Sequence, residues 1–226
     1  MRAAIFDFDG VLVDSEPLHY EALRQALLPE GIELSEEEYA RFYLAYDDRE
    51  GARIALERHG IPYDPERVEG VARRKAAAFE ALLPGVGFFP GARELVRALT
   101  ADVPLAIASG ALRREIEAIL GAGGLLDAFA AIVGADDVGQ GKPHPEPYLT
   151  ALARLAPLVP GIVPADCLVF EDSMAGIAAA RAAGMRVVAV AHSYPASRLS
   201  AAHHVVESLS RLEPAGLRGL FSLSAP

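Results

Sequence analysis

The feature that most constrains the fold is a series of short apolar runs that alternate with helical patterns after residue 90. The runs are rich in Val, Ile, Leu and Ala, which is typical of strands buried on both faces. Between them, helical spacing of apolar residues predicts helices at 91–100, 111–120, 145–156 and 173–183. Strands that alternate with helices form a parallel sheet covered on both faces. We therefore predict an α/β fold with strands at 2–8, 104–109, 131–134, 167–170, 187–191 and 204–206.

A different pattern separates the first strand from this α/β region. Helical spacing begins after Glu16, and Ser35 followed by Glu38 predicts a capping box at the start of a second helix. A third helix is expected from about 49 to 58, and Asp64 before Pro65 predicts the start of a fourth. No strand pattern is present from 16 to 83. We therefore expect a core of residues 1–14 and 89–226 and an inserted all-helical domain over 15–88.

Polar side chains follow several of the predicted strands at the point where each strand ends. In an open parallel sheet, ligands bind beyond the carboxyl ends of the strands. Four short motifs carry these side chains: DxD (7–9), SG (109–110), GK (141–142) and ED (171–172). Each motif alone is common in loops or helix caps, but here the four occur in order, each after a predicted strand. The sequence therefore predicts one site built from Asp7, Asp9, Ser109, Gly110, Lys142, Glu171 and Asp172.

Carboxylates that converge in a cleft repel one another, and a divalent cation relieves that repulsion. Mg²⁺ prefers a few carboxylates, water and a substrate phosphate. We expect Mg²⁺ at this site, with ligands from Asp7, Asp9, Glu171 and Asp172.

The same residue types suit phosphoryl transfer. Asp7 is the candidate nucleophile, which would form an aspartyl phosphate. Asp9 is placed to protonate the leaving oxygen and later to deprotonate water. Lys142 would add a fixed positive charge, and Ser109 and the amide of Gly110 would hold phosphoryl oxygens.

Four segments, taken together, resemble the haloacid dehalogenase superfamily: DFDGVLVDSE (7–16), IASG (107–110), GKPHPEPY (141–148) and VFEDSMAGIAAARAAGM (169–185). FFPGARELVRAL (88–99) is similar to the segment that re-enters the core in that family. The resemblance implies a Rossmann-like core, a four-helix cap inserted after the first strand and Mg²⁺-dependent phosphoryl transfer. Dehalogenases lack the second aspartate, so Asp9 indicates the phosphatase and mutase branch, similar to β-phosphoglucomutase and phosphoglycolate phosphatase.

The resemblance also implies substrate contacts from the cap. His19 lies where the β-phosphoglucomutase subfamily places a histidine near the active-site opening. Arg49 falls where the mutases keep an arginine for the far phosphate of the substrate. Lys75 is a third candidate, and a solvated helix face is the competing explanation for Arg49 and Lys75.

These features predict an enzyme, a Mg²⁺-dependent phosphatase of small phosphorylated metabolites such as sugar phosphates or phosphoglycolate. One alternative is a hexose phosphate mutase of the β-phosphoglucomutase type. The mutases place a lysine three residues after the serine that corresponds to Ser109, and this chain has Leu112 there. A second alternative is a non-catalytic phospho-acceptor or binding module, but receiver domains are about half this length and have no helical insert.

Net charge, hydropathy and cysteine content limit the kinds of partner and the location that we expect for this protein. The formal net charge of −10 argues against nucleic acid as the main partner, because phosphate backbones bind basic faces. The apolar runs are too short to span a membrane. A single cysteine, Cys167, permits no internal disulfide, and from the first residues we expect no leader before the first strand. We therefore expect a cytoplasmic monomer or weak dimer that binds a small phosphate ester.

Overall fold

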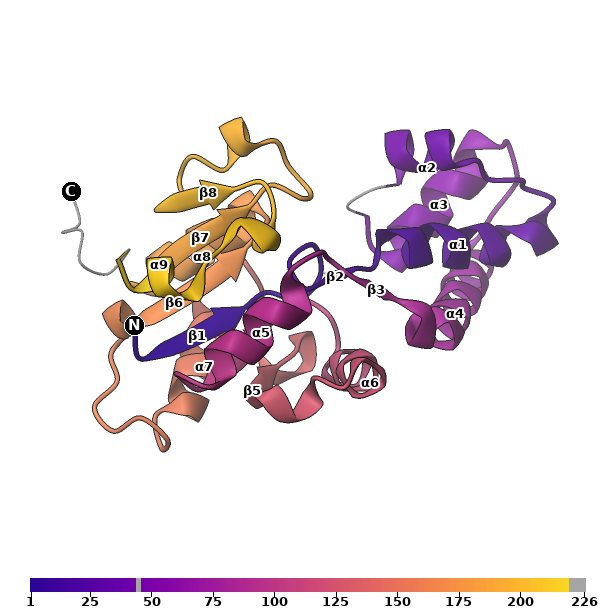
Figure 1. Ribbon diagram of the computed structural model, residues 1–226. Coiled ribbons are helices and arrows are strands. Elements are labelled where there is room, and N and C mark those ends of the chain that lie inside the picture. Colours follow the sequence, from indigo (N-terminus) through magenta and orange to yellow (C-terminus); the bar gives the residue numbers. More distant parts are fainter. Residues whose placement is uncertain (44–45, 220–226) are drawn as a thin grey trace. The chain divides into compact units, whose positions relative to one another are not determined.

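A computed structural model describes residues 1–43 and 46–219 of the chain. The chain divides into two compact units (Figure 1). The core unit comprises Met1–Asp14 and the chain from Gly87 onward, and the helical unit comprises Ser15–Val86. Gly87 and Phe88, which we expected in the inserted domain, belong to the core unit because they pair with residues 13 and 14.

The core unit is built on a six-stranded parallel sheet in the order β5-β4-β1-β6-β7-β8. All six strands were predicted, and their ends differ from the predicted ends by a few residues. The first strand, β1, lies near the middle of the sheet between β4 and β6. Their bounds are β1 (Ala3–Phe6), β4 (Leu105–Ala108), β5 (Phe129–Val133), β6 (Cys167–Glu171), β7 (Arg186–Val190) and β8 (His204–Val206).

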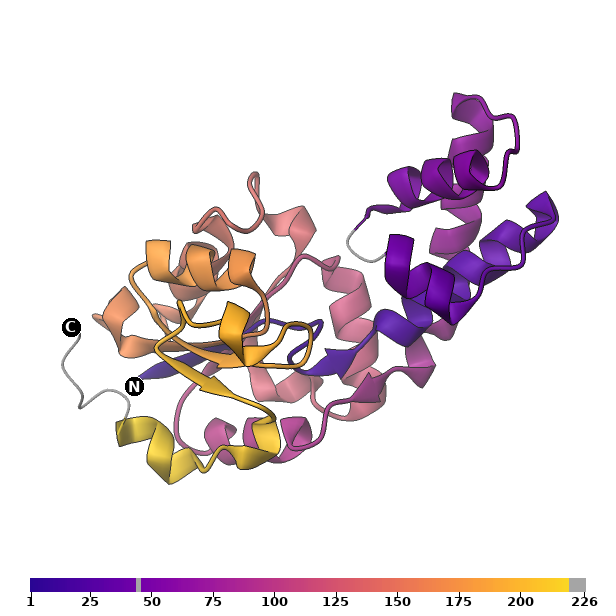
Figure 2. The same cartoon turned by 90° about the horizontal axis from the view of Figure 1, so that it is seen from above.

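The strand order determines which face each crossover helix covers. Connections between parallel strands are right-handed, so crossovers that run in opposite directions along the sheet lie on opposite faces. From β1 the chain moves outward to β4 and β5, then returns past β1 to β6, β7 and β8. Figure 2 shows the result, with α7 and α8 on one face and α5 on the other. The bounds of the core helices are α5 (Ala92–Thr100), α6 (Arg113–Gly123), α7 (Glu146–Leu155), α8 (Met174–Ala182) and α9 (Pro214–Gly219).

Alternate strand residues pack under α7 and α8. This cluster joins Ile5, Val169 and Val187 of the strands to Tyr148 and Ile177 of the helices. Each of these side chains is at most 1% exposed. Complete burial of this kind requires apolar residues on both faces of each strand, which is why the strands appear in the sequence as uninterrupted apolar runs.

The helical unit contains the four predicted helices, α1 (Glu16–Leu27), α2 (Glu36–Phe42), α3 (Asp48–Arg58) and α4 (Pro65–Leu82). The Asp64 side chain accepts a hydrogen bond from the Arg67 amide and caps α4, as predicted. Ser35 caps α2 through the Glu38 amide, but the Glu38 side chain contacts Tyr43 and His59 instead of completing the capping box. Leu23, Leu27, Leu56 and Val71 are among the apolar side chains of the unit's own core.

Two short strands were not predicted. Strand β2 (Val13–Asp14) pairs antiparallel with β3 (Gly87–Phe88), so that Val13 lies opposite Phe88 and Asp14 opposite Gly87. The Phe89 amide continues this pairing with a hydrogen bond to the Leu12 carbonyl. Two residues are too few to give a recognisable period, which explains why the sequence did not reveal these strands.

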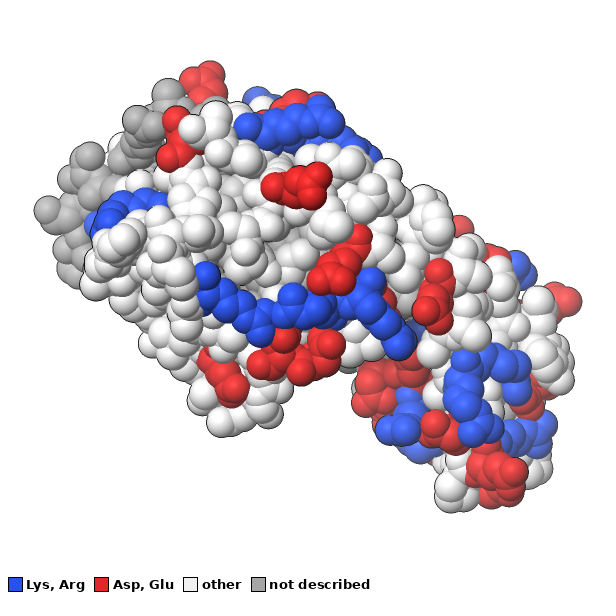
Figure 3. Space-filling model, turned by 90° about the horizontal axis from the view of Figure 1, so that it is seen from below, with Lys and Arg blue, Asp and Glu red and all other residues white. Residues whose placement is uncertain are grey.

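No helix among residues 1–43 and 46–219 is both long enough and apolar enough to cross a bilayer. On the face drawn in Figure 3, Lys and Arg side chains form a narrow band across the core unit, with Asp and Glu side chains beside it.

Candidate active site

The predicted polar residues of the core unit gather where neighbouring strands end. Asp7 directly follows β1, and its amide donates to the Phe170 carbonyl of β6 (2.9 Å). Ser109 directly follows β4, and its amide donates to the Val133 carbonyl of β5 (3.0 Å). Because β1, β4 and β6 are adjacent and parallel, these exits lie at one edge of the sheet.

The Asp7 carboxylate is buried and asymmetrically bonded. The Phe8 amide and Lys142 Nζ each lie 2.8 Å from Oδ1. Both donors reach this one oxygen, which leaves Oδ2 as the oxygen available to a ligand. Burial raises the pKa of Asp7 well above its ordinary value, and the charge of Glu171 raises it further, although Lys142 acts in the opposite direction.

Lys142 bridges two carboxylates. Its Nζ lies 2.6 Å from Glu171 Oε1 in addition to its contact with Asp7. Burial alone would lower the pKa of Lys142, but Asp7 and Glu171 hold that pKa above its ordinary value. The residue is therefore a fixed ammonium ion, and its side chain also lies over the Tyr148 ring, 5.1 Å from the centroid.

Glu171 is completely buried and accepts hydrogen bonds on both oxygens. Lys142 and the Tyr148 hydroxyl (2.8 Å) reach Oε1, while the amides of Asp172 and Ser173 and the Ser173 hydroxyl reach Oε2, each at 2.9 Å. Burial raises the pKa of Glu171, but Lys142 and the other donors outweigh this effect, so the pKa lies below its ordinary value.

Gly176 makes room for this carboxylate. A Cβ atom at Gly176 would lie 1.5 Å from Glu171 Oε1, which no side chain can accommodate. The first turn of α8 therefore approaches Glu171 closely enough for the Ser173 amide to bond to it.

Asp172 faces the loop that carries the two N-terminal aspartates. A Cβ at Gly10 would lie 1.9 Å from Asp172 Oδ2, and Gly10 has a φ of 74°, so the turn requires glycine on both counts. Burial raises the pKa of Asp172 to about 6, and Glu171 adds to the shift while a hydrogen bond from Ser193 opposes it.

Asp9 and Ser109 lie at the edge of the cluster. The Ser109 hydroxyl is 3.5 Å from Asp9 Oδ2, and the same hydroxyl accepts a hydrogen bond from the Ala111 amide (3.0 Å). Ser109 is buried and Gly110 is exposed, with nothing within 4 Å of the position that its Cβ would occupy. There is thus open space beside the Gly110 backbone at the end of β4.

The acidic residues fit a divalent cation. Among the described residues, Asp7, Glu171 and Asp172 form the one group whose ligand atoms all lie within 4.8 Å of one another, and all three are buried. Lys142 supplies one positive charge against these three carboxylates. Oxygen donors with an excess of negative charge are what Mg²⁺ and similar hard cations bind. Asp9, predicted as a fourth ligand, is not in this group.

The three predicted substrate residues of the helical unit already have partners within that unit. Arg49 pairs with Glu69 (Nε to Oε2, 2.7 Å), and 73% of its side chain is exposed. Lys75 is buried and pairs with Asp48. His19 stacks on Phe79 with ring centroids 4.2 Å apart. Burial lowers the pKa of His19 to about 4, and the nearby charge of Lys75 lowers it further, while Asp48 opposes the shift.

Three residues at the core site were not predicted as site residues. Tyr148 holds Glu171, Ser193 donates to Asp172, and His192 bonds to the Gly10 carbonyl. His192 and Ser193 follow the buried strand β7 as a polar pair, which is the same pattern that identified Asp7 and Asp9. Tyr148 lies in an amphipathic helix, where a buried tyrosine is indistinguishable in sequence from an ordinary core residue.

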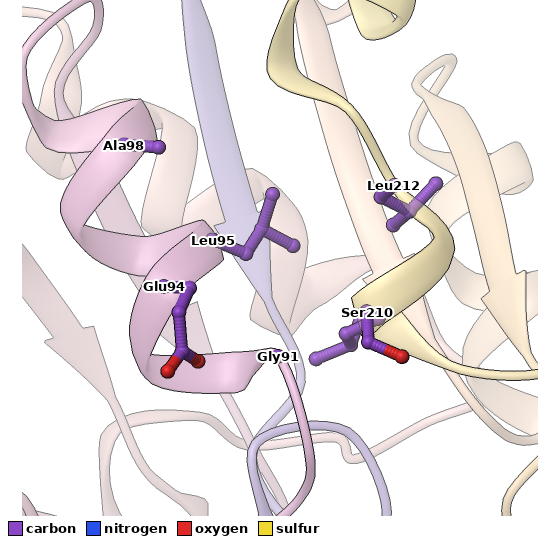
Figure 4. Close-up of a pocket in the computed structure, with 7 residues that line it drawn as sticks. Gly91, Glu94, Leu95, Ala98, Ser210 and Leu212 are labelled. Carbon is purple, nitrogen blue, oxygen red and sulfur yellow. The ribbon is translucent and has the colours of Figure 1, made fainter.

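A separate hollow of about 450 Å³ lies on the core unit between α5 and residues 209–212 (Figure 4). Leu95, Ala98, Leu209 and Leu212 give it a largely apolar lining. None of the predicted site residues lines this hollow, so it is distinct from the cluster at the strand ends.

Comparison with known proteins agrees with the geometry. Residues 1–184 match the family model of the haloacid dehalogenase-like hydrolases. The chain belongs to this family. Because that family and its phosphatase members match most of the chain, the protein is a phosphatase of the haloacid dehalogenase-like family.

Two curated relatives match most of the chain. The phosphorylated carbohydrates phosphatase of Thermotoga maritima is 37% identical over 196 residues, which are 85% of this chain and 87% of that protein. Protein CbbY of Rhodobacter capsulatus is 34% identical over 206 residues, 86% of this chain and 87% of that protein.

A solved structure gives the same result for the fold. The β-phosphoglucomutase of Clostridium difficile superimposes with a TM-score of 0.77 at 25% identity and covers 98% of this chain and 97% of its own. The predicted family, its Rossmann-like core and its phosphatase assignment are therefore confirmed.

Proposed function

We propose that this protein is a Mg²⁺-dependent phosphatase of small phosphorylated carbohydrates that works through an aspartyl phosphate on Asp7. The observation that carries the proposal is the asymmetric bonding of the buried Asp7 carboxylate. Lys142 and the Phe8 amide reach Oδ1, and Oδ2 receives no donor from the described residues. A carboxylate held in this way has one oxygen fixed and the other free to attack phosphorus.

In the first half-reaction, Asp7 Oδ2 forms a bond to phosphorus as the ester P–O bond breaks. The leaving alkoxide needs a proton, which Asp9 would donate as a general acid. Lys142, anchored by Glu171, places an ammonium group beside the reacting carboxylate. Ser109 and the open backbone at Gly110 are suited to hold the oxygens of the transferring phosphoryl group.

In the second half-reaction, Asp9 takes a proton from a water molecule, and the water oxygen bonds to phosphorus as the acyl phosphate bond breaks. Inorganic phosphate leaves and Asp7 returns to its starting form. The same residue thus serves as acid and then as base, which requires it to lie at the rim of the cluster. The contact of Asp9 with Ser109, at the end of β4, supports this role.

Asp7 and Asp172 would hold the cation, with Glu171 behind them. Glu171 already accepts from five donors, whereas Asp7 accepts from two and the Asp172 side chain accepts from Ser193, so these two carboxylates have more capacity left for a cation. The cation would supply charge neutralisation for the buried carboxylates and for a bound phosphate.

The substrate class is inferred from the relatives and from the helical unit. The Thermotoga relative is named for phosphorylated carbohydrates. Arg49, Lys75 and His19 are polar groups that could bind sugar hydroxyls or a second phosphate, and Arg49 and Lys75 each pair with a carboxylate that an anionic ligand could replace. A mutase remains the alternative, and Leu112 in place of a cation favours hydrolysis.

The test is a panel of phosphorylated metabolites assayed for release of inorganic phosphate, with EDTA and with added Mg²⁺. We expect hydrolysis of one or more sugar phosphates that EDTA abolishes and Mg²⁺ restores. Full activity in EDTA, or no hydrolysis of any phosphate ester, would contradict the proposal.

β-Glucose 1-phosphate with a trace of the 1,6-bisphosphate separates the two enzyme types. Efficient conversion to glucose 6-phosphate with little phosphate release would identify a mutase instead. Release of phosphate without that conversion supports the phosphatase.

A further inference from the structure

The exit of β7 also contributes to the site. Two and three residues after β7, His192 Nδ1 lies 2.9 Å from the Gly10 carbonyl, and the Ser193 hydroxyl donates to Asp172 Oδ2. The His192 ring also stacks on Phe89, with ring centroids 3.9 Å apart and an interplanar angle of 20°. All of these residues belong to the core unit.

We infer that His192 and Ser193 are positioning residues that fix the metal-binding carboxylate and the nucleophile loop against each other. The inference rests on the proposed function, because it assigns Asp172 to the cation. Neither residue is proposed to touch the substrate, so both act through Asp172 and the loop around Gly10.

The Ser193 contact orients the Asp172 carboxylate. Ser193 is exposed, yet its hydroxyl points to a carboxylate that is only 5% exposed. Because Ser193 engages Oδ2, this hydroxyl fixes the orientation in which the Asp172 carboxylate faces a cation. Partners that orient a ligating carboxylate usually contribute 10- to 100-fold to metal affinity.

Because Gly10 has no side chain, Ser193 and the Asp172 carboxylate both approach the backbone of its loop closely. A Cβ at Gly10 would lie 1.9 Å from Asp172 Oδ2 and 2.8 Å from Ser193 Oγ. A displacement of any one of the three groups would therefore move the other two.

His192 makes a separate contact with the same loop, through the Gly10 carbonyl. The Gly10 carbonyl can only accept a hydrogen bond, so Nδ1 must carry the proton that is donated to it. The Gly10 amide donates to the Val13 carbonyl, and the Phe89 amide donates to the Leu12 carbonyl. His192 thus contacts both chain segments that lead to the helical unit, one by the hydrogen bond and one by the stack.

The first test measures binding of Mn²⁺ to the full-length protein, without substrate, by electron paramagnetic resonance. We expect Ser193→Ala to bind Mn²⁺ about tenfold or more weakly than wild type. Ser193→Thr keeps the hydroxyl and should bind within about threefold of wild type. Ser200→Ala, at another exposed serine seven residues further on, is the matched control and should bind as wild type does.

The possible outcomes are distinct. Equal affinity in wild type and Ser193→Ala would overturn the inference and leave the proposed function intact. A wild-type protein that binds no Mn²⁺ and whose hydrolysis is insensitive to EDTA would overturn the proposed metal site, and the inference with it. Melting curves establish that all variants are folded, which we expect because Ser193 is exposed.

The second test separates the two contacts of His192. His192→Phe keeps the stack on Phe89 and loses the hydrogen bond, whereas His192→Asn keeps a donor near the Nδ1 position and loses the stack. We expect His192→Phe to slow the single-turnover phosphorylation of Asp7 about tenfold and His192→Asn to retain most of the rate. The same rate in His192→Phe and in wild type would overturn the role of His192.

Discussion

Charged side chains are held in different ways in the two units of this protein. In the core unit, Lys142, Glu171 and Asp7 are buried and bonded to one another. In the helical unit, Arg49 and Lys75 pair with Glu69 and Asp48, whose side chains are 37% and 42% exposed. The core charges therefore depend on one another, whereas the acidic partners in the helical unit can be rehydrated when a pair breaks.

Under the proposed function, this difference matches what each unit would have to do. The transfer of a phosphoryl group has the same geometry for every ester, so a fixed and desolvated cluster serves it best. Selection among esters requires groups that can exchange a protein partner for a substrate partner. The four predictions that follow test this contrast.

The largest expected effect comes from Asp7→Asn. The change removes the nucleophile but keeps a carbonyl oxygen that can accept from the Phe8 amide, so the protein should stay folded. Turnover of the best sugar phosphate should fall on the order of 10⁴-fold or more. Beryllium fluoride should protect the wild-type protein from thermal unfolding and have no effect on the variant. Substantial steady-state activity in the variant would rule out the covalent route.

Lys142 of the core unit and Lys75 of the helical unit allow a direct comparison, because each is a buried lysine paired with a carboxylate. Lys142→Met leaves completely buried Glu171 without its cation, which should cost about 3–5 kcal/mol in the free energy of unfolding. Lys75→Met leaves Asp48, which is accessible to water, and should cost no more than about 1 kcal/mol. Urea unfolding of the full chain at pH 7 measures both values. Equal losses of stability in the two variants would mean that the charged groups of the helical unit depend on one another as strongly as those of the core unit.

Acid should destabilise the protein through His19. Its pKa of about 4 lies below the ordinary 6.5, so the fold favours the neutral imidazole. That stabilisation is complete above pH 6.5 and is lost as the pH falls toward 4, by about 3 kcal/mol. Lys75 and Asp48 are the charged groups that face the ring.

The His19 prediction is measured as a difference between proteins. His19→Phe keeps an aromatic ring on Phe79 and cannot be protonated, so its loss of stability between pH 7 and pH 4 should be smaller by that amount. His144→Gln, at a histidine of the core unit that is 43% exposed, serves as the control. If His19→Phe loses as much stability as wild type, burial of His19 does not set the acid response.

The smallest effect is expected from Glu69→Gln. Arg49 and Glu69 are exposed, so separating them should leave the melting temperature unchanged within error. If Arg49 contacts the substrate, its release should lower KM for that substrate by no more than about fivefold, with kcat unchanged. Arg53 also pairs with two glutamates in α3, and Glu57→Gln is the control. A change in kcat would place Arg49 at the reacting centre.

Part of this arrangement was readable from the sequence because it depends on local patterns. Apolar runs identified the strands, and the topology of a parallel sheet then places Asp7, Ser109 and Glu171 at neighbouring exits. Asp64 identified the start of a helix through its own backbone contact.

Other features depend on contacts between segments far apart in the chain. The Arg49–Glu69 and Lys75–Asp48 pairs follow from the packing of α3 against α4, and no spacing rule encodes them. The role of Tyr148 depends on the position of Glu171 beneath it. His192 and Ser193 carried a recognisable pattern, a polar pair after a buried strand, but that pattern gained meaning only when Gly10 and Asp172 were seen beside them.

The pairing of β2 with β3 has a consequence for how such a protein can be divided and rebuilt. The chain leaves the core at Asp14 and returns at Gly87, and these two residues lie opposite each other in an antiparallel ladder. Strand ends in this register are what a two-residue Asn-Gly turn joins in a β-hairpin. A gene in which that dipeptide replaces codons 15–86 would encode a continuous core with its strand connectivity intact. The same junction could accept a helical insert from a relative, and the substrates of such a chimera would show whether the helical unit sets substrate preference.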